Sequence, residues 1–279
     1  MAGFNTLSCR LGEEISVKDG FSMEKLKQIM EDAECVLIGI GSEFGREFLD
    51  KELFQIYTEK KKQTEEVYDW LLPFIRGEVD VNEQCKKYLQ AYQQIFELVK
   101  NKNYFVITLN QDDIILNSSF DKGKITAPCG SYQRLQCSNG CEESMVQAEE
   151  SVAEIIEQLK DAALTLEDIT RPTCERCGAP LVFNVVEEKN YMEEGYMKSW
   201  EKYKMWLTGT LNRKLCLLEL GVDFRYPSII RWAFEKVAFL NEKAVLVRIN
   251  EKYPQLTEEL KGKAYSYHVN SVDFFYQSN

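Results

Sequence analysis

The chain has 279 residues, of which 44% are apolar and 28% are charged, so it is long enough to bury a substantial core. Its net charge of −11 argues against nucleic acid and anionic membranes as partners, because both would repel it on average. No run of about 18 apolar residues could span a bilayer and the amino terminus does not resemble a signal sequence, so we expect a cytoplasmic protein.

The predicted elements alternate between amphipathic helices and short apolar strands. The first helix covers residues 21–34 with Ser22 as its N-cap, and the first strand follows over residues 35–38. Further helices are predicted over residues 51–72, 82–100, 146–163 and 228–240. Further strands are predicted over residues 104–109, 215–220 and 244–249. The acidic helix at 146–163 either contacts a partner or is solvated, and its charge pattern favours the second alternative.

Each predicted strand ends in a polar or glycine break. This order is typical of an α/β protein with a mostly parallel, Rossmann-like sheet and helices on both faces. Because ligands bind beyond the carboxyl ends of such strands, we expect the breaks to converge on one cleft. The breaks lie at Gly39–Ser42, Asn110–Asp112, Gly221–Asp223 and Asn250.

Nine cysteines in a chain of this kind favour free thiols or metal ligands over disulfides. Two close pairs could each supply two ligands to a tetrahedral zinc ion, and a closed set of four predicts a structural rather than a catalytic zinc. The alternative is two unrelated pairs. We expect a zinc-binding module over residues 126–184, inserted into a nucleotide-binding domain of residues 1–125 and 185–279 that includes a helical segment at 50–100. The four predicted zinc ligands are Cys137, Cys141, Cys174 and Cys177.

The turn after the first strand has the spacing Gly39-x-Gly41-x-x-x-Gly45, which suggests backbone amides that approach a phosphate. Phe44 stands where a dinucleotide-binding dehydrogenase carries its third glycine, and no acidic residue ends a second strand about 20 residues later. A nicotinamide dehydrogenase is therefore disfavoured. A phosphate-binding turn and a plain strand-to-helix turn both stay open.

The order of these features resembles that of the sirtuins, over nearly the whole chain. The segments that carry the resemblance are Gly39–Gly41, Thr108–Asp112 (TLNQD), Cys129–Tyr132 (CGSY), the four cysteines, Gly221–Asp223 and Ile249–Asn250. One branch is more similar than the others: the macrodomain-linked sirtuins, which act as protein ADP-ribosyltransferases. The similarity to that branch lies in residues 218–222 (LELGV), Pro227, residues 229–231 (IIR) and residues 234–235 (FE).

The resemblance implies that the chain binds NAD and transfers ADP-ribose to a protein acceptor. A lipoyl-carrier-type protein is then a candidate acceptor, and a macrodomain protein a candidate partner. Asn110 would organise the nicotinamide ribose, Asp112 would hold the nicotinamide amide, and Asn250 would contact the adenosine ribose. Alternatively, the first two are turn formers and the third is a strand-end cap. The implied NAD-binding residues are Gly39, Ile40, Gly41, Asn110, Asp112, Gly221, Val222 and Asn250.

One departure from the family pattern concerns the catalytic group. Cys129 stands where deacylase sirtuins carry a general-base histidine and the macrodomain-linked branch carries glutamine. A thiol with an ordinary pKa of about 8.5 is a poor base at neutral pH, so lysine deacetylation is not expected. Cys129 could act as a nucleophile only with a lowered pKa and a neighbouring base. The single histidine, His268, lies far from the motif.

Other departures concern charge. Residues 184–186 (NVV) hold no arginine where the macrodomain-linked branch carries one, and Arg46 is the nearest candidate for the arginine of usual sirtuins. Asp223 would repel a phosphate unless Arg225 offsets it or the carboxylate points to solvent. Three hypotheses follow: a protein ADP-ribosyltransferase with Asn110 and Asp112 in its catalytic site, a non-catalytic module that binds NAD or ADP-ribose, or an NAD glycohydrolase.

Overall fold

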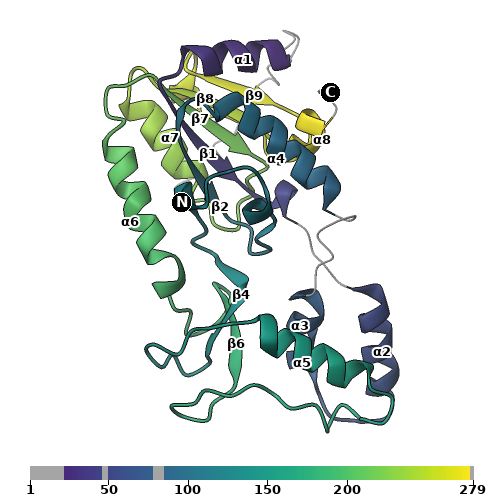
Figure 1. Cartoon of the computed structure of the whole chain (residues 1–279). Helices are drawn as coiled ribbons and strands as arrows, with labels where there is room; N and C mark the ends of the chain where they lie inside the picture. The colour runs from purple at the N-terminus through teal and green to yellow at the C-terminus, as the bar shows by residue number, and fades with distance from the viewer. Residues whose placement is uncertain (1–21, 46–49, 78–84, 277–279) are drawn as a thin grey trace, which may run out of the picture.

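A six-stranded, fully parallel sheet forms the larger part of the molecule in the computed structural model, which describes residues 22–45, 50–77 and 85–276 (Figure 1). The strands lie in the order β3-β2-β1-β7-β8-β9, so after β3 the chain crosses back past β2 and β1 and places β7 beside β1. Their bounds are β1 (Cys35–Ile40), β2 (Asn103–Thr108), β3 (Ile125–Thr126), β7 (Leu215–Leu220), β8 (Val245–Ile249) and β9 (Ala264–Tyr267). All carboxyl ends therefore lie at one edge of the sheet.

The central strands are mostly apolar because helices cover both faces of the sheet, and their two charged residues, Glu219 and Arg248, pair with each other. Every residue of β1 and β7 is buried. Helices α1 (Met23–Asp32), α4 (Lys86–Val99) and α8 (Ser271–Tyr276) pack on one face. Helices α6 (Glu194–Thr208) and α7 (Arg231–Leu240) pack on the other. The predicted α/β class with helices on both faces is confirmed.

A smaller, antiparallel sheet lies beside the parallel one (Figure 1). It has the order β5-β4-β6, and three helices share its apolar core. The bounds are β4 (Gly130–Cys137), β5 (Val146–Gln147), β6 (Leu181–Val185), α2 (Lys51–Lys61), α3 (Leu72–Gly77) and α5 (Glu149–Lys160). Of the helical segment expected at 50–100, α2 and α3 thus pack against the small sheet, whereas α4 packs against the parallel sheet.

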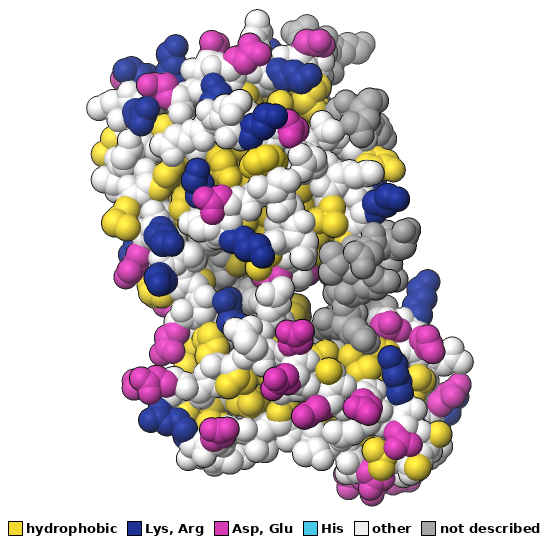
Figure 2. All heavy atoms as spheres, in the orientation of Figure 1, with side chains coloured by type: hydrophobic (Ala, Val, Ile, Leu, Met, Phe, Trp, Pro, Cys, Tyr) yellow, Lys and Arg dark blue, Asp and Glu magenta, His cyan; other side chains and the backbone are white. Residues whose placement is uncertain are grey.

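The predicted acidic helix corresponds to α5. Its apolar residues Ile155, Ile156 and Leu159 are buried, and its glutamates are exposed. Acidic side chains are prominent on the lower part of the molecule in the space-filling view (Figure 2). In the described part of the chain, no helix is long and apolar enough to cross a bilayer.

The four predicted strands form, with boundary differences of at most two residues. The single helix predicted over residues 51–72 is wrong: α2 ends at Lys61, and a turn and a short 3-10 helix (Asp69–Leu71) precede α3. An ion pair of 2.8 Å between Lys61 Nζ and Asp69 Oδ1 spans the turn between α2 and the 3-10 helix. Ser22 occupies the N-cap position of α1, but its side chain makes no capping hydrogen bond.

A buried ion network joins β7, β8 and α7. Arg248, fully buried in β8, donates from Nε and Nη2 to the two carboxylate oxygens of Glu219 at 2.7 and 2.9 Å. Its Nη2 also donates to Glu235 at 2.8 Å, and Arg231 lies 3.4 Å from Glu219. Burial raises the pKa of Glu219, and the guanidinium groups oppose that rise. The network fixes α7 against the sheet directly below the carboxyl edge.

Candidate functional site

The loops at the carboxyl edge are held together by backbone contacts. The amide of Gly41 donates to the Leu220 carbonyl at 2.8 Å, and the amide of Gly221 donates to the Ile249 carbonyl at 2.8 Å. A Cβ on Gly41 would lie 2.4 Å from the Cα of Val222, so this close approach requires glycine. The structure thus brings the loops after β1, β7 and β8 into contact.

The loop after β2 joins this group through Asn110. A Cβ on Gly45 would lie 2.6 Å from Oδ1 of Asn110, which places the asparagine against the loop after β1. The Nδ2 atom of Asn110 is buried and makes no hydrogen bond of normal geometry to any residue that the structure describes. Burial raises the pKa of Tyr92 well above its usual value, and Asn110 partly opposes this rise. The Tyr92 hydroxyl nevertheless has no hydrogen bond of normal geometry.

Gly39 and Ile40 lie within β1 rather than in the loop. A Cβ on Gly39 would lie 2.4 Å from Cγ2 of Ile230 and 2.8 Å from the ring of Phe234, so the absence of a side chain lets α7 and the turn before it pack closely. The Ile40 side chain belongs to the core on the opposite face. These packing contacts account for a glycine at position 39 and an isoleucine at position 40 without a bound ligand.

Asn250 is buried, and its side chain connects two loops. Its Nδ2 donates to the Val222 carbonyl at 2.8 Å, while Oδ1 accepts from the amides of Lys252 and Tyr253 at 3.0 and 2.7 Å. The Val222 side chain is fully buried in the core. These contacts match the strand-end cap that the sequence left open as an alternative role.

Asp112 and Asp113 begin the turn after Gln111. Asp112 Oδ1 accepts from the amide of Ile114 at 3.1 Å, as a turn former would. Asp113 has a left-handed backbone, with a φ of 56°, and its buried carboxylate is hydrogen-bonded to Ser131 Oγ. Burial raises the pKa of Asp113 to about 6, although Ser131 and the more distant Arg134 oppose the rise.

Cys129 is fully buried just before β4. Burial, with a smaller contribution from Glu187, raises the pKa of its thiol to about 12, and Arg225 opposes this only in part. The thiol is therefore protonated at neutral pH, which argues against a thiolate nucleophile. His268 is exposed after β9, and Arg46 lies outside the described residues.

A clasp that the sequence did not predict links the two sheets near Cys129. Glu187, after β6, accepts from Gln111 Nε2 at 2.6 Å and from the Tyr226 hydroxyl at 3.1 Å. The same Nε2 also donates to the Cys129 carbonyl at 3.1 Å. The carboxylate of Asp223 accepts from the amide of Arg225 at 2.9 Å. No sequence motif marks Glu187, because its partners come from loops 76 and 39 residues away.

A second unpredicted carboxylate lies directly at the parallel sheet's edge. Glu43 follows Gly41 in a short 3-10 helix (Ser42–Phe44). One of its oxygens accepts from the amide of Glu251 at 2.7 Å. The other accepts from the amide and the hydroxyl of Ser271, both at 2.6 Å.

The four predicted zinc ligands meet at the end of the small sheet away from these loops. Their Sγ atoms all lie within 4.8 Å of one another. Tetrahedral Zn–S bonds of about 2.3 Å would bring the sulfurs to about 3.8 Å from each other. Gly140 and Gly178 adopt positive φ values of 71° and 72° in the two turns, a conformation that favours glycine. The donor set fits a structural zinc ion.

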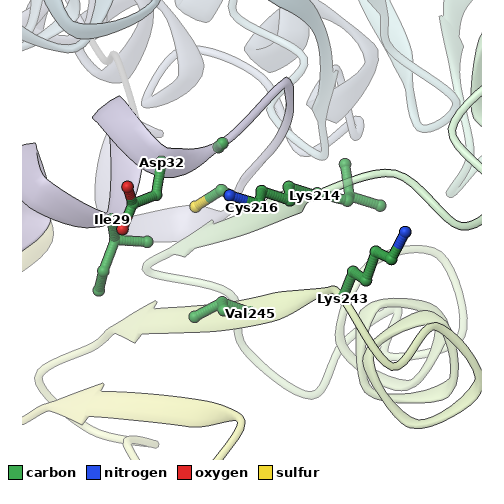
Figure 3. A pocket seen from close by; sticks show the side chains of 8 residues that line it. Ile29, Asp32, Lys214, Cys216, Lys243 and Val245 are labelled. Carbon is green, nitrogen blue, oxygen red and sulfur yellow. The ribbon is translucent and has the colours of Figure 1, made fainter.

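A cavity lies at the other end of the parallel sheet. It has a volume of about 250 Å³ and is bordered by α1 and by the amino ends of β7 and β8 (Figure 3). Lys214 and Lys243 at its rim are exposed, and Cys216 in its wall is buried. None of the predicted site residues lines it.

No protein-family model matches the chain. Among curated proteins it is similar to a Staphylococcus aureus protein named protein ADP-ribosyltransferase, with 22% identity over 249 residues, 82% of this chain and 78% of that protein. It is also similar to a Fusarium oxysporum f. sp. cubense protein named probable bifunctional ADP-ribose hydrolase/ADP-ribosyltransferase. That match has 29% identity over 166 residues and covers 57% of this chain but 28% of the fungal protein, so the chain spans little more than a quarter of it.

The chain is similar in fold to solved structures of sirtuins. A mutant Sir2 homologue in complex with ADP-ribose matches with a TM-score of 0.55 at 16% identity, over 91% of this chain and 94% of that one. A complex of Sir2 with a p53 peptide and NAD+ matches with a TM-score of 0.54 at 13% identity, over 92% of this chain and 97% of that one. The chain therefore has a sirtuin-like fold.

Proposed function

We propose that the chain binds NAD at the carboxyl edge of the parallel sheet and transfers its ADP-ribosyl group to a protein. The observation that carries the proposal is the convergence of the loops after β1, β2, β7 and β8 at one edge, where the buried Nδ2 of Asn110 makes no well-formed hydrogen bond within the described residues. The neighbouring Tyr92 hydroxyl also lacks a well-formed hydrogen bond, and buried polar groups are nearly always satisfied, so an acceptor from a ligand would complete the bonding of this pair. The sirtuin-like fold and the name of the S. aureus relative support the choice of ligand and reaction.

The residues at this edge fit NAD in part. Asn110 offers a buried donor without a well-formed hydrogen bond among the described residues, and Asp112 lies two residues further along the same loop. At the loops after β8 and β9, by contrast, the Glu43 carboxylate already accepts hydrogen bonds from the backbone amides of Glu251 and Ser271. NAD would supply an ADP-ribosyl group on a labile glycosidic bond. The chain's own part is to orient the ribose through Asn110 and the nicotinamide amide through Asp112.

A second candidate is a module that binds NAD or ADP-ribose without turnover. The burial of Cys129 favours it, because a thiol with a pKa of about 12 cannot take up a proton from a ribose hydroxyl at neutral pH. In both proposals the zinc ion is structural. If the chain is a transferase, its partner is an acceptor protein. A lipoyl-carrier-type acceptor and a macrodomain partner remain proposals that rest on the sequence resemblance.

Incubation with NAD separates these functions. A transferase releases nicotinamide and adds ADP-ribose to an acceptor protein, detected as a mass shift. A glycohydrolase releases nicotinamide and free ADP-ribose without a protein acceptor, because water takes the ADP-ribosyl group. A binding module gives calorimetric heat with NAD or ADP-ribose but no nicotinamide. If neither ligand binds, all three proposals are refuted.

Substitution of Asn110 tests the residue that carries the proposal. We expect Asn110→Ala to abolish any turnover and to weaken binding by about tenfold, the value of one hydrogen bond to a buried donor. The matched control is Asn117→Ala, which alters an exposed asparagine of the segment after β2. Equal behaviour of the two variants would contradict the role of Asn110.

A further inference from the structure

Glu43 makes more contacts across the carboxyl edge than its place in a short turn requires. Its backbone amide approaches the Gly221 carbonyl at 3.4 Å. Its carboxylate reaches the loop after β8 at Glu251 and the segment after β9 at Ser271, 208 and 228 residues away in sequence. Three donors at 2.6 to 2.7 Å surround the two oxygens. Such charge-assisted hydrogen bonds hold the side chain in one place.

Gly221 leaves the space that the Glu43 side chain occupies. With a φ of 59°, Gly221 carries no atom where Glu43 passes. A Cβ there would lie 2.4 Å from Cβ of Glu43 and 2.9 Å from its Oε2. The glycine that the sequence assigns to a phosphate turn therefore makes room, in this structure, for a carboxylate of the chain itself.

The position of the carboxylate matters because of what binds at such edges. Ligands of parallel α/β sheets lie beyond the carboxyl ends of the strands, where free backbone amides donate to their phosphate and hydroxyl oxygens. At this edge the Glu43 carboxylate accepts the hydrogen bonds of the Glu251 and Ser271 amides, so these amides are not free to donate to a ligand. It also places a negative charge where a diphosphate would bring two more.

We propose that Glu43 is an internal competitor for the ADP-ribose part of the ligand and sets the affinity of the site for dinucleotides. The proposal rests on the proposed function. A dinucleotide binds only when the carboxylate turns away from Glu251 and Ser271, so the intact protein binds ADP-ribose weakly. Removal of the carboxylate leaves the amides of Glu251 and Ser271 free to donate to the ligand. It also removes the repulsion between the carboxylate and the diphosphate.

The test is calorimetric titration of the full-length protein with ADP-ribose. We expect Glu43→Gln, which keeps the size of the side chain and one acceptor oxygen, to bind about tenfold more tightly than wild type, and Glu43→Ala more tightly still. Glu251→Gln is the matched control, because it removes one charge from an exposed side chain of the neighbouring loop and leaves the backbone amide in place. We expect a change of less than about threefold for it.

The outcomes are distinct. If wild type and both Glu43 variants bind ADP-ribose equally, the competition is refuted and the proposed function stands. If the Glu43 variants bind more weakly, Glu43 belongs to the ligand site and the competition is refuted as well. If no variant binds, the proposed function falls together with this inference. Circular dichroism and zinc content identify a variant that has not folded, and Glu43→Gln then decides in place of Glu43→Ala.

Discussion

Asp113 makes the stability of the protein depend on pH in a defined direction. Its carboxyl is 7% exposed, and burial raises its pKa from 3.8 to about 6. Because the pKa is raised on folding, its contribution to stability is complete below pH 3.8 and is lost as the pH rises through 6. The full shift corresponds to about 3 kcal/mol, of which about 1.5 kcal/mol falls between pH 5 and pH 8.

Asp113→Asn removes this titration and keeps the shape of the side chain. Asparagine tolerates the left-handed φ of 56° at this position. In urea unfolding, we expect the stability of Asp113→Asn relative to wild type to be about 1.5 kcal/mol more favourable at pH 8 than at pH 5. Asp121→Asn, at an exposed carboxylate nearby in sequence, is the control and should show a constant difference. A constant or falling difference for Asp113→Asn would refute the reasoning.

Three further predictions concern stability and metal content. Cys174→Ser should lower bound zinc from one equivalent to none by elemental analysis and should lower the melting temperature, which a chelator should also do to wild type. Gly39→Ala should cost about 1–3 kcal/mol in urea unfolding, because its Cβ would overlap Ile230; an unchanged midpoint would contradict this packing. Arg248→Met should cost about 3–5 kcal/mol, since it leaves Glu219 buried with only a 3.4 Å contact to a cation; a loss below about 1 kcal/mol would show that the network is dispensable.

The parallel sheet could be predicted because its strands are continuous apolar runs that end in polar or glycine breaks. Once the strands are parallel, their carboxyl ends must share one edge, so the meeting of Gly41, Val222 and Asn250 follows from the fold class. The four cysteines could be predicted to meet because their spacing is typical of zinc turns.

Other elements depend on tertiary contacts that leave little trace in the sequence. Helix α6 was missed although Trp200, Tyr203 and Leu207 recur at helical spacing and pack against the parallel sheet, so here the sequence did carry the signal. Strand β9 was missed because it is short and its Tyr265 is exposed. The break after α2 was not predicted; an exposed Lys61–Asp69 ion pair spans it in the structure, and a helical pattern does not reveal such a contact.

Within the site, the sequence predicted loops better than side chains. Gly39 was expected near a phosphate, which stays a prediction; in the structure its missing side chain also makes room for Ile230 and Phe234. Glu43 and Glu187 were not singled out, because a glutamate in a polar turn gives no sign of partners far away in the chain. Such long-range contacts appear only in the folded structure.

Hydrogen exchange measured by mass spectrometry with and without ADP-ribose tests the central claim, a dinucleotide site at the carboxyl edge, most directly. We predict slower exchange in the peptides that hold residues 41–45, 109–112, 221–225 and 250–253, and no change around the four cysteines. Protection confined to the cavity beside Lys214 and Lys243, or no protection at saturating ADP-ribose, would contradict the claim.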